Sequence, residues 1–501
     1  MFRSAPIPCS IGGVRRYQLT PLKILFASAE VAPFAKVGGL ADVVGSLPQA
    51  LHALGHEVAV ALPLYGTIDR AKWGIGAGAA IAAPFGGATL NVTVRDVVRD
   101  GVRYLFMDEP TLLGRPKVYG EVDDVRRFAL FCSAVREYAG RASPPDVVHA
   151  HDWHTGLVPE LLKQRDADRL PQTATVFTIH NLAYQGLTRE RVLKLVGLPE
   201  DRLLIEKKRF GKQVDPMARG IAFADVVSTV SERYAQEILT PEFGEGLEPL
   251  LEERRNDLYG IVNGIDTKVF DPRTDRYIAA NYSADDPTGK AQCKAALQQE
   301  FKLPAGAKTP VFGVVGRLVE QKGVDLLAAV VPQLLQAGMQ VVMLGTGDPK
   351  YEEQLTDLAL NFDKTFGLKI GFDVALAQRI YAGADFFLMP SRFEPCGLGQ
   401  LISLRYGTIP VVHAVGGLAV TVRDADARPA NGNGFSFDTY TAAAFRNACD
   451  RAVVAFKDAD RLARLRAIGM REDHSWDASA KEYVTLYETA LANRGKQEGV
   501  A

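Results

Sequence analysis

The sequence predicts an α/β protein built from two doubly wound parallel sheets, one in each half of the chain. In the first half, an apolar run at 21–30 leads into a glycine-rich loop, an amphipathic segment from about Leu40 to Leu54 and a second apolar run. This is the order of a βαβ unit. The same order starts again with "TPVFGVVG" at 309–316. At 501 residues the chain also exceeds one ordinary hydrophobic core, so two domains are expected.

The later strands are expected where short apolar runs precede polar clusters. These runs lie in "PDVVHAHDW", "TATVFTIHN", "FFLMP" and "GFSFD". "VFGVVG" and "FFLMP" are continuously apolar rather than alternating, which is typical of parallel strands buried on both faces. In such sheets, ligands bind beyond the carboxyl ends of the strands.

The expected domain organisation has four parts. Residues 1–20 form a disordered leader, residues 21–258 the first domain and residues 259–475 the second. Residues 476–501 form a final helix. Its apolar positions recur at helical spacing: Trp476, Ala480, Tyr483, Leu486 and Tyr487.

The composition argues against nucleic-acid and membrane partners. The chain has 58 Lys and Arg against 59 Asp and Glu, without the basic excess that such partners need. No uninterrupted apolar stretch reaches the roughly 18 residues that a transmembrane helix requires. The five cysteines are scattered and form no CxxC pair, so a reducing compartment, the cytoplasm, is expected. The first 29 residues lack Asp and Glu, and a plastid location follows if they are a transit peptide.

Three polar features in the first half have both a functional and a structural interpretation. "KVGGLADV" places Lys36, Gly38 and Gly39 before a helix, where free N–H groups can bind an anion, but a plain Gly-Gly turn fits as well. "HAHDWH" could supply two metal ligands from one strand face, but nothing in the sequence completes a ligand shell. His149 is therefore interpreted as a hydrogen-bonded core residue. His180, after the next strand, could bind a substrate hydroxyl or cap a loop.

Two further clusters follow strands of the second half. Arg317 and Lys322 lie on the loop after the first of these strands, where a guanidinium and an ammonium suit a diphosphate. "PSRFEPCGLGQL" holds a carboxylate, Glu394, and a thiol, Cys396, just before a helix expected near Leu398. Cys396 has no histidine near it in sequence to activate it, so Glu394 is the better functional candidate.

Together and in this order, the motifs resemble the bacterial glycogen synthase and plant starch synthase family. The resemblance runs from about Lys23 to the final helix. It is carried by "KVGGLADV", "HAHDWH", "TIHNLAYQG", "VNGID", "GRLVEQKG", "PSRFEPCGL" and "RYGTIPVV…GGL". It implies a retaining glucosyltransferase of the GT-B type, with two facing Rossmann-like domains and a C-terminal helix that crosses back to the first. Such an enzyme would move glucose from ADP-glucose to the non-reducing end of an α-1,4-glucan such as glycogen, with no cofactor and no metal.

The resemblance also implies roles for particular residues. Glu394 would hold the glucose, Arg317 and Lys322 the diphosphate, and His180 and Asp152 the surroundings of the transferred sugar. Phe372 would stack on adenine, and Trp153 would lie on the acceptor side. The substrate-binding positions together are Lys36, Gly38, Gly39, Asp42, Trp153, Asn263, Phe372, Cys396, Gly397 and Leu398.

The sequence departs from the family pattern at two positions. Gly399 stands where the family usually has threonine or another residue with a side chain, and Val420 stands where it usually has aspartate. Gly399 could reduce phosphate contacts or loosen the start of the helix. Three alternatives therefore stay open: a related transferase with another donor or acceptor, a phosphorylase with a pyridoxal-phosphate lysine, and a glucan-binding homologue of low activity.

Overall fold

The computed structural model describes residues 20–498, apart from 142, 190, 200–203 and 208–210. The chain forms two compact units. The first unit comprises the chain up to Gly264 together with the C-terminal segment that begins at Trp476. The second unit is Ile265–Ser475. The sequence placed the join at 258/259. The structure places it a few residues later because β11, at Leu258–Gly260, is still a strand of the first sheet.

The first unit is built on a nine-stranded sheet in the order β11-β10-β7-β6-β1-β2-β5-β4-β3. Its strands are β1 (Lys23–Ala27), β2 (Glu57–Pro63), β3 (Gly78–Phe85), β4 (Ala88–Arg99), β5 (Val102–Asp108), β6 (Val147–His151), β7 (Ala174–Ile179), β10 (Val226–Thr229) and β11. A separate pair consists of β8 (Leu204–Lys207) and β9 (Gly211–Val214). From β11 to β5 all pairs are parallel, as the sequence predicts.

The antiparallel edge of this sheet is absent from the sequence-based expectation. β3 and β4 form a hairpin, and β4 pairs antiparallel with β5. The turn between β3 and β4 is Gly86–Gly87, and both glycines have positive φ, at 66° and 79°. A two-residue turn of this conformation matches the twist of a hairpin. The Gly-Gly pair between two runs of strand length is the signal that would have predicted it.

Helices cover both faces of the first sheet. They are α1 (Gly39–Ala53), α2 (Arg70–Trp73), α3 (Asp124–Ala139), α4 (Leu157–Arg165), α5 (Val192–Leu195), α6 (Pro216–Phe223), α7 (Glu232–Glu237), α8 (Glu248–Glu253) and α17 (Trp476–Glu498), with 3₁₀ turns η1 (Trp153–Thr155) and η2 (Arg255–Asp257). One apolar core joins the sheet to α3, α4 and α6, and a second joins its other face to α1 and α17. The expected helix at 40–54 is confirmed as α1.

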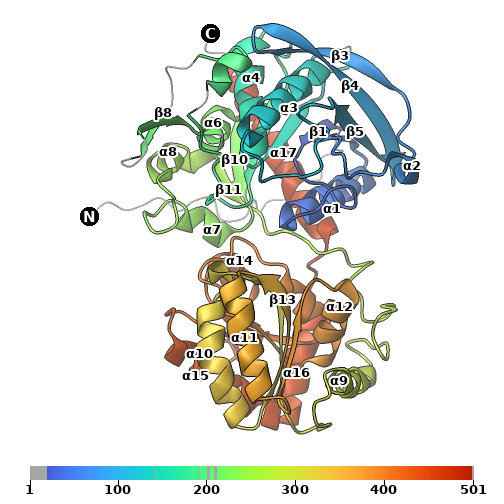
Figure 1. Ribbon diagram of the computed structural model, residues 1–501, viewed down its shortest axis with the longest axis vertical. Helices are drawn as coiled ribbons and strands as arrows, with labels where there is room; N and C mark the ends of the chain where they lie inside the picture. The colour runs from blue at the N-terminus through green and yellow to red at the C-terminus, as the bar shows by residue number, and fades with distance from the viewer. Residues whose placement is uncertain (1–19, 142, 190, 200–203, 208–210, 499–501) are drawn as a thin grey trace. The chain divides into compact units, whose positions relative to one another are not determined.

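The final helix belongs to the first unit, as predicted (Figure 1). α17 packs against α1 and β7. Trp476, Ala480, Tyr483, Leu486 and Tyr487 are all buried in the core that it shares with α1. The helical spacing read from the sequence is therefore the spacing of a single buried stripe.

The second unit has a six-stranded parallel sheet in the order β14-β13-β12-β15-β16-β17. Its strands are β12 (Val311–Leu318), β13 (Gln340–Gly347), β14 (Phe366–Ile370), β15 (Phe386–Met389), β16 (Ile409–His413) and β17 (Phe435–Phe437). Its helices are α9 (Thr288–Glu300), α10 (Val324–Gln336), α11 (Pro349–Asn361), α12 (Val374–Gly383), α13 (Gly399–Arg405), α14 (Gly416–Thr421), α15 (Ala442–Lys457) and α16 (Ala459–Arg471), with the 3₁₀ turn η3 (Glu320–Lys322). α10, α11 and α15 cover one face, and α9 and α12 the other (Figure 1).

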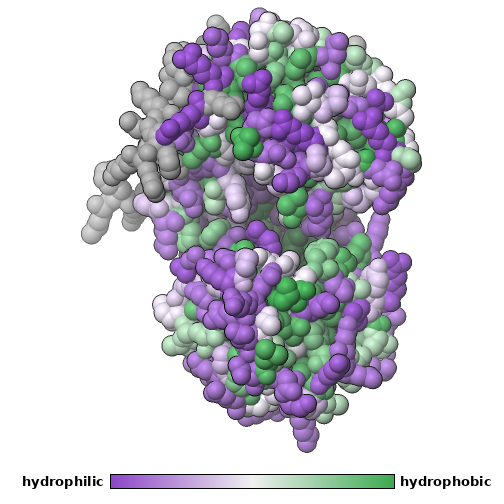
Figure 2. Space-filling model, in the orientation of Figure 1, coloured by the Kyte–Doolittle hydropathy of each residue, from purple (hydrophilic) through white to green (hydrophobic). Residues whose placement is uncertain are grey.

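The surface of each unit is mixed in polarity. On the face drawn in Figure 2, hydrophilic residues are interspersed with smaller groups of apolar ones. None of the helices within the described ranges is both long enough and apolar enough to span a bilayer.

Candidate functional site

Polar residues of the first unit gather at the carboxyl ends of three adjacent strands, β1, β6 and β7. Asp152 directly follows β6, and His180 directly follows β7. The backbone N–H of His180 donates to Asp152 Oδ1 at 2.7 Å. Two residues that the sequence singled out separately are therefore joined by the register of neighbouring strands.

Asp152 is a buried carboxyl on a strained backbone. Its φ of 56° lies in the left-handed region, which residues other than glycine adopt at an energetic cost. Burial raises the pKa of Asp152 to about 7, although the N–H groups of His180 and Asn181 oppose the rise. Strain and a perturbed pKa at a strand end are typical of functional sites.

Of the histidines in "HAHDWH", His149 is hydrogen-bonded on both ring nitrogens within the core. His149 Nε2 lies 2.6 Å from Thr178 Oγ1, and Nδ1 lies 2.9 Å from the hydroxyl of Tyr487. The interpretation of His149 as a core residue is confirmed. Across the described ranges, no three His, Cys, Asp or Glu side chains are placed to hold a metal ion.

The glycine loop before α1 carries a residue that the sequence analysis missed. Glu30 is buried after β1, and its Oε2 accepts the N–H groups of Val37 and Gly38 at 2.5 and 2.6 Å. Burial raises the pKa of Glu30. Glu30 therefore already holds the two N–H groups that directly precede α1, and an anion at this helix start would be bound by the N–H groups that follow them. A lone carboxylate seven residues upstream gives little sequence signal.

The other expected residues of the first unit differ in their surroundings. Lys36 Nζ pairs with Asp42 Oδ1 at 2.6 Å on the exposed side of the loop. Trp153 is half-buried, with its ring edge-on to Phe128. Asn263 is buried, and its Oδ1 has no hydrogen-bond partner within the described residues. A buried oxygen without a hydrogen-bond partner is unusual in a folded protein.

The site residues of the second unit lie at the carboxyl ends of β12 and β15, which are neighbours. Lys322 Nζ lies 2.6 Å from Glu394 Oε2, and Ser391 donates to the same oxygen at 3.0 Å. Arg317 is exposed, and its hydrogen bond to Gln321 is long at 3.3 Å. Arg317 lies in β12 itself, so the sequence was wrong to assign it to the loop. Lys322 lies on that loop, between β12 and α10, in the 3₁₀ turn η3.

Local backbone geometry holds Lys322 beside Glu394. Gly323 ends the η3 turn with a φ of 72°, and a Cβ there would lie 2.0 Å from the carbonyl oxygen of Pro390. Only glycine permits this approach. The N–H of Arg392 donates to the carbonyl oxygen of Gln321 at 2.9 Å and closes the two segments together.

The segment after Glu394 forms a turn into α13. Cys396 is buried, which agrees with the preference for Glu394 over Cys396 as the functional candidate. Gly397 has a φ of 75°, and Leu398 is the residue that precedes the helix. Phe372 lies between β14 and α12 and is 82% exposed, so the face of its ring is open to a ligand.

Comparisons with known proteins agree over almost the whole chain. The family model described as the starch synthase catalytic domain matches residues 23–253, and that of glycosyl transferases group 1 matches 297–464. The glycogen synthase of Geotalea daltonii is 43% identical over 95% of this chain and 100% of its own length. That of Anaeromyxobacter dehalogenans is 47% identical over 94% and 100%.

The chain belongs to the glycogen and starch synthase family. A solved structure, the catalytic domain of starch synthase IV from Arabidopsis thaliana bound to ADP and acarbose, covers 94% of this chain and 100% of its own, with 35% identity and a TM-score of 0.87. This synthase therefore has the GT-B architecture of two parallel-sheet domains and a C-terminal helix, as the sequence predicts.

The departure of this synthase at Gly399 has a steric basis. A Cβ on Gly399 would lie 2.9 Å from Cε1 of Phe387 and 3.2 Å from the sulfur of Met389. Both side chains come from β15, under the start of α13. The space that a larger residue would take is therefore filled from the strand. Val420, the second departure, is partly exposed near the end of α14, and nothing in the structure explains it.

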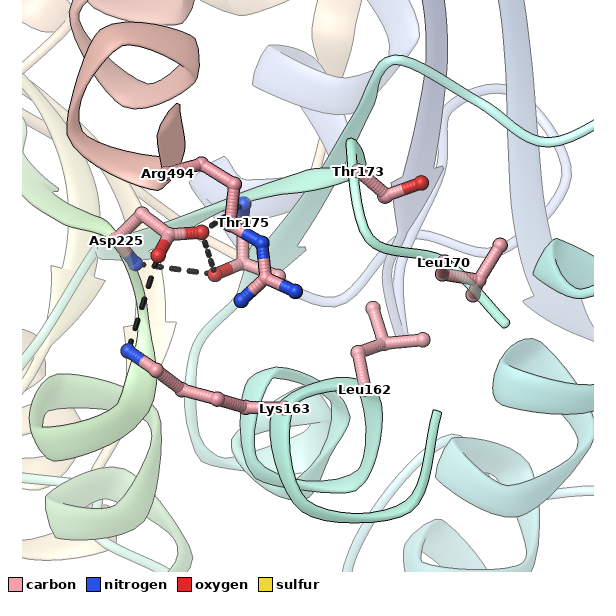
Figure 3. Close-up of a pocket in the computed structure, with 7 residues that line it drawn as sticks. All are labelled: Leu162, Lys163, Leu170, Thr173, Thr175, Asp225 and Arg494. Carbon is pink, nitrogen blue, oxygen red and sulfur yellow. Dashed lines mark hydrogen bonds and ion pairs between the residues drawn. The ribbon is translucent and has the colours of Figure 1, made fainter. Parts of the chain in front are cut away.

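A small pocket, partly open to solvent, lies at the opposite, amino-terminal edge of the first sheet (Figure 3). Thr173 and Thr175 are at the amino end of β7, and Asp225 precedes β10. The pocket is lined by Leu162, Lys163, Leu170, Thr173, Thr175, Asp225 and Arg494. Arg494 of α17 also donates to the carbonyl oxygen of Pro171 at 2.9 Å. Since ligands of such sheets bind at the carboxyl ends, we assign this pocket to the anchoring of α17.

Proposed function

We propose that this synthase transfers glucose from ADP-glucose to the non-reducing end of an α-1,4-glucan such as glycogen, with retention of configuration. The observation that carries the proposal is the pair of Lys322 and Glu394 at the ends of β12 and β15. An ammonium and a carboxylate in contact can separate to meet the two parts of a sugar nucleotide. The similar starch synthase IV of known structure is bound to ADP, which supports this choice of donor.

In this proposal Arg317 and Lys322 bind the diphosphate. Breaking the bond between the sugar and the diphosphate builds negative charge on the leaving group, so cations stabilise the transition state more than the ground state. Arg317 is exposed and weakly held, which leaves its guanidinium available for phosphate oxygens. With Lys322 drawn to phosphate, Glu394 becomes an acceptor for glucose hydroxyls, and the leaving phosphate helps to take the proton of the attacking hydroxyl.

The remaining assignments follow the same chemistry. We assign adenine stacking to Phe372, whose ring is exposed. Asp152, His180 and Asn263 are assigned to the transferred sugar, and Trp153 to the acceptor. Lys36 and Gly38 of the loop, with Gly39 and Asp42 of the first turn of α1, are assigned to phosphate and sugar. The turn of Cys396, Gly397 and Leu398 is assigned to the donor. The glycogen synthases compared above come from bacteria, which favours the cytoplasm over a plastid.

The test is the incorporation of labelled glucose from ADP-glucose into glycogen, with UDP-glucose as the control donor. We expect α-linked product, and we expect Arg317→Ala and Glu394→Ala each to lower kcat at least about 100-fold, the scale for a group that stabilises developing charge. Transfer that survives both substitutions would overturn the site assignment. Binding of glycogen without transfer would favour the non-catalytic alternative, and a preference for UDP-glucose would overturn the donor.

A further inference from the structure

We infer that His151 is a positioning residue that fixes the ring of His180 as a hydrogen-bond donor on Nδ1. The geometry behind this is the 3.0 Å separation of His151 Nδ1 and His180 Nε2. His151 is the last residue of β6 and is fully buried, whereas His180 is half-buried at the end of the neighbouring strand β7. The role of the donor toward a sugar rests on the proposed function, but the tautomer itself does not.

Two nitrogens at this distance must share one proton. Burial lowers the pKa of His180 to about 3 and that of His151 well below its usual value, so both rings are neutral near pH 7. A neutral imidazole carries one N–H and one bare nitrogen. Either His151 donates from Nδ1, or His180 donates from Nε2.

The surroundings of His151 favour donation from His151 Nδ1 to His180 Nε2. His151 Nε2 is buried and has no partner within the described residues. If His180 donated, His151 would carry its proton on Nε2 and leave a buried N–H unpaired, which folded proteins rarely tolerate. The ring of Phe26 cannot accept that N–H. The two rings are nearly parallel, at 12°, so the face of Phe26 lies above the plane of His151, whereas an imidazole N–H points within that plane.

The consequence concerns the ligand side of His180. With Nε2 accepting from His151, His180 carries its proton on Nδ1. Within the described residues this nitrogen has no hydrogen-bond partner and is not among the fully buried unpaired atoms. It therefore stays accessible to a ligand as a donor. His180 can then donate to a sugar oxygen, but it cannot act as a general base, because its only lone pair is already used.

Two substitutions of His151 test the position of its N–H donor, because both keep a polar side chain at residue 151. His151→Asn keeps an amide N–H near the place of Nδ1, whereas His151→Gln moves it toward the place of Nε2. His149→Asn is the matched control, because His149 is equally buried in the same strand but bonds to Thr178 and Tyr487 instead. The ¹⁵N signals of labelled histidines, assigned with His180→Gln, report which nitrogen of His180 is protonated.

We expect the Nδ1–H form of His180 in the unsubstituted enzyme, in His151→Asn and in His149→Asn, and a mixture of forms in His151→Gln. We also expect kcat/KM of His151→Gln to fall about tenfold, the worth of one net hydrogen bond, with partial recovery in His151→Asn. A proton on Nε2 of His180 in the unsubstituted enzyme would overturn the inference even if glucose transfer from ADP-glucose is found. So would an unchanged His180 spectrum in folded His151→Gln. If that variant does not fold, the spectrum of the unsubstituted enzyme alone decides which ring donates.

Discussion

Lys322 and Glu394, 72 positions apart in sequence, form an ion pair 2.6 Å long in which the carboxylate is the buried partner. The side chain of Glu394 is 6% exposed and that of Lys322 is 26% exposed. A buried carboxylate keeps its charge at a tolerable cost only while a cation and hydrogen-bond donors face it. The pair therefore serves stability in the absence of substrate as well as the proposed catalysis.

Removing Lys322 alone is expected to lower the free energy of unfolding more than removing the charges of both Lys322 and Glu394. Lys322→Met leaves Glu394 with Ser391 as its side-chain donor, and we expect the free energy of unfolding to fall by about 1–3 kcal/mol. Glu394→Gln in the same chain should restore part of this loss. Urea unfolding of the two single variants and the double variant measures it. Lys350→Met, at an exposed and loosely paired lysine, should leave the unfolding curve unchanged. Strict additivity of the two single effects would contradict this prediction.

Gly399 is expected to be required by its neighbours rather than by the helix. Gly399→Thr should lower the free energy of unfolding by about 1–3 kcal/mol, because the new side chain crowds Phe387. Phe387→Leu in the same chain should recover part of the loss. Gly495→Ala is the control, since no described residue lies within 4 Å of a Cβ at that position and alanine is the better helix former. A Gly399→Thr variant as stable as the unsubstituted chain would contradict this prediction, because it would show that Phe387 can shift to make room for the new side chain.

Glu30 is expected to hold the glycine loop in its binding shape. Glu30→Ala removes the acceptor of the Val37 and Gly38 N–H groups, so both amides should exchange with solvent faster. We expect KM for ADP-glucose to rise about tenfold, the scale for one or two lost charge-assisted hydrogen bonds. Hydrogen exchange and steady-state kinetics at saturating glycogen measure the two effects. Unchanged exchange of Val37 and Gly38 would contradict the role of Glu30, whatever the kinetics.

The strands and their order along the chain could be predicted because buried parallel strands are continuously apolar. The runs that became β1, β7, β12 and β15 show this pattern, and α17 shows an unbroken helical stripe. The β3–β4 hairpin was missed because its small residues, such as Ala79 and Ala80, give weak strand signals. Only the turn at Gly86–Gly87 marked it.

The sequence predicted which residues belong to the candidate site, but not which of them are in contact with one another. Lys322 and Glu394 were recognised separately, and their meeting depends on β12 and β15 being neighbours, which chain order does not specify. The contact between His151 and His180 depends in the same way on the pairing of β6 with β7. Glu30 was missed because its function comes from the loop that folds back onto it, and a single glutamate in sequence gives no sign of that.

Asp152 is expected to make the stability of this synthase fall as the pH rises. Burial holds its pKa at about 7 in the folded chain, whereas an unfolded aspartate titrates at about 3.9. Between these values the folded state binds more protons than the unfolded state, so the free energy of unfolding decreases as the pH rises from about 4 to about 7. Asp152→Asn keeps an oxygen that can accept from the His180 N–H and removes the titration, so this decrease should shrink by about 2–4 kcal/mol. Urea unfolding at a series of pH values measures it, with Asp357→Asn on the exposed side of α11 as the control. Parallel pH profiles for Asp152→Asn and the unsubstituted enzyme would contradict the raised pKa.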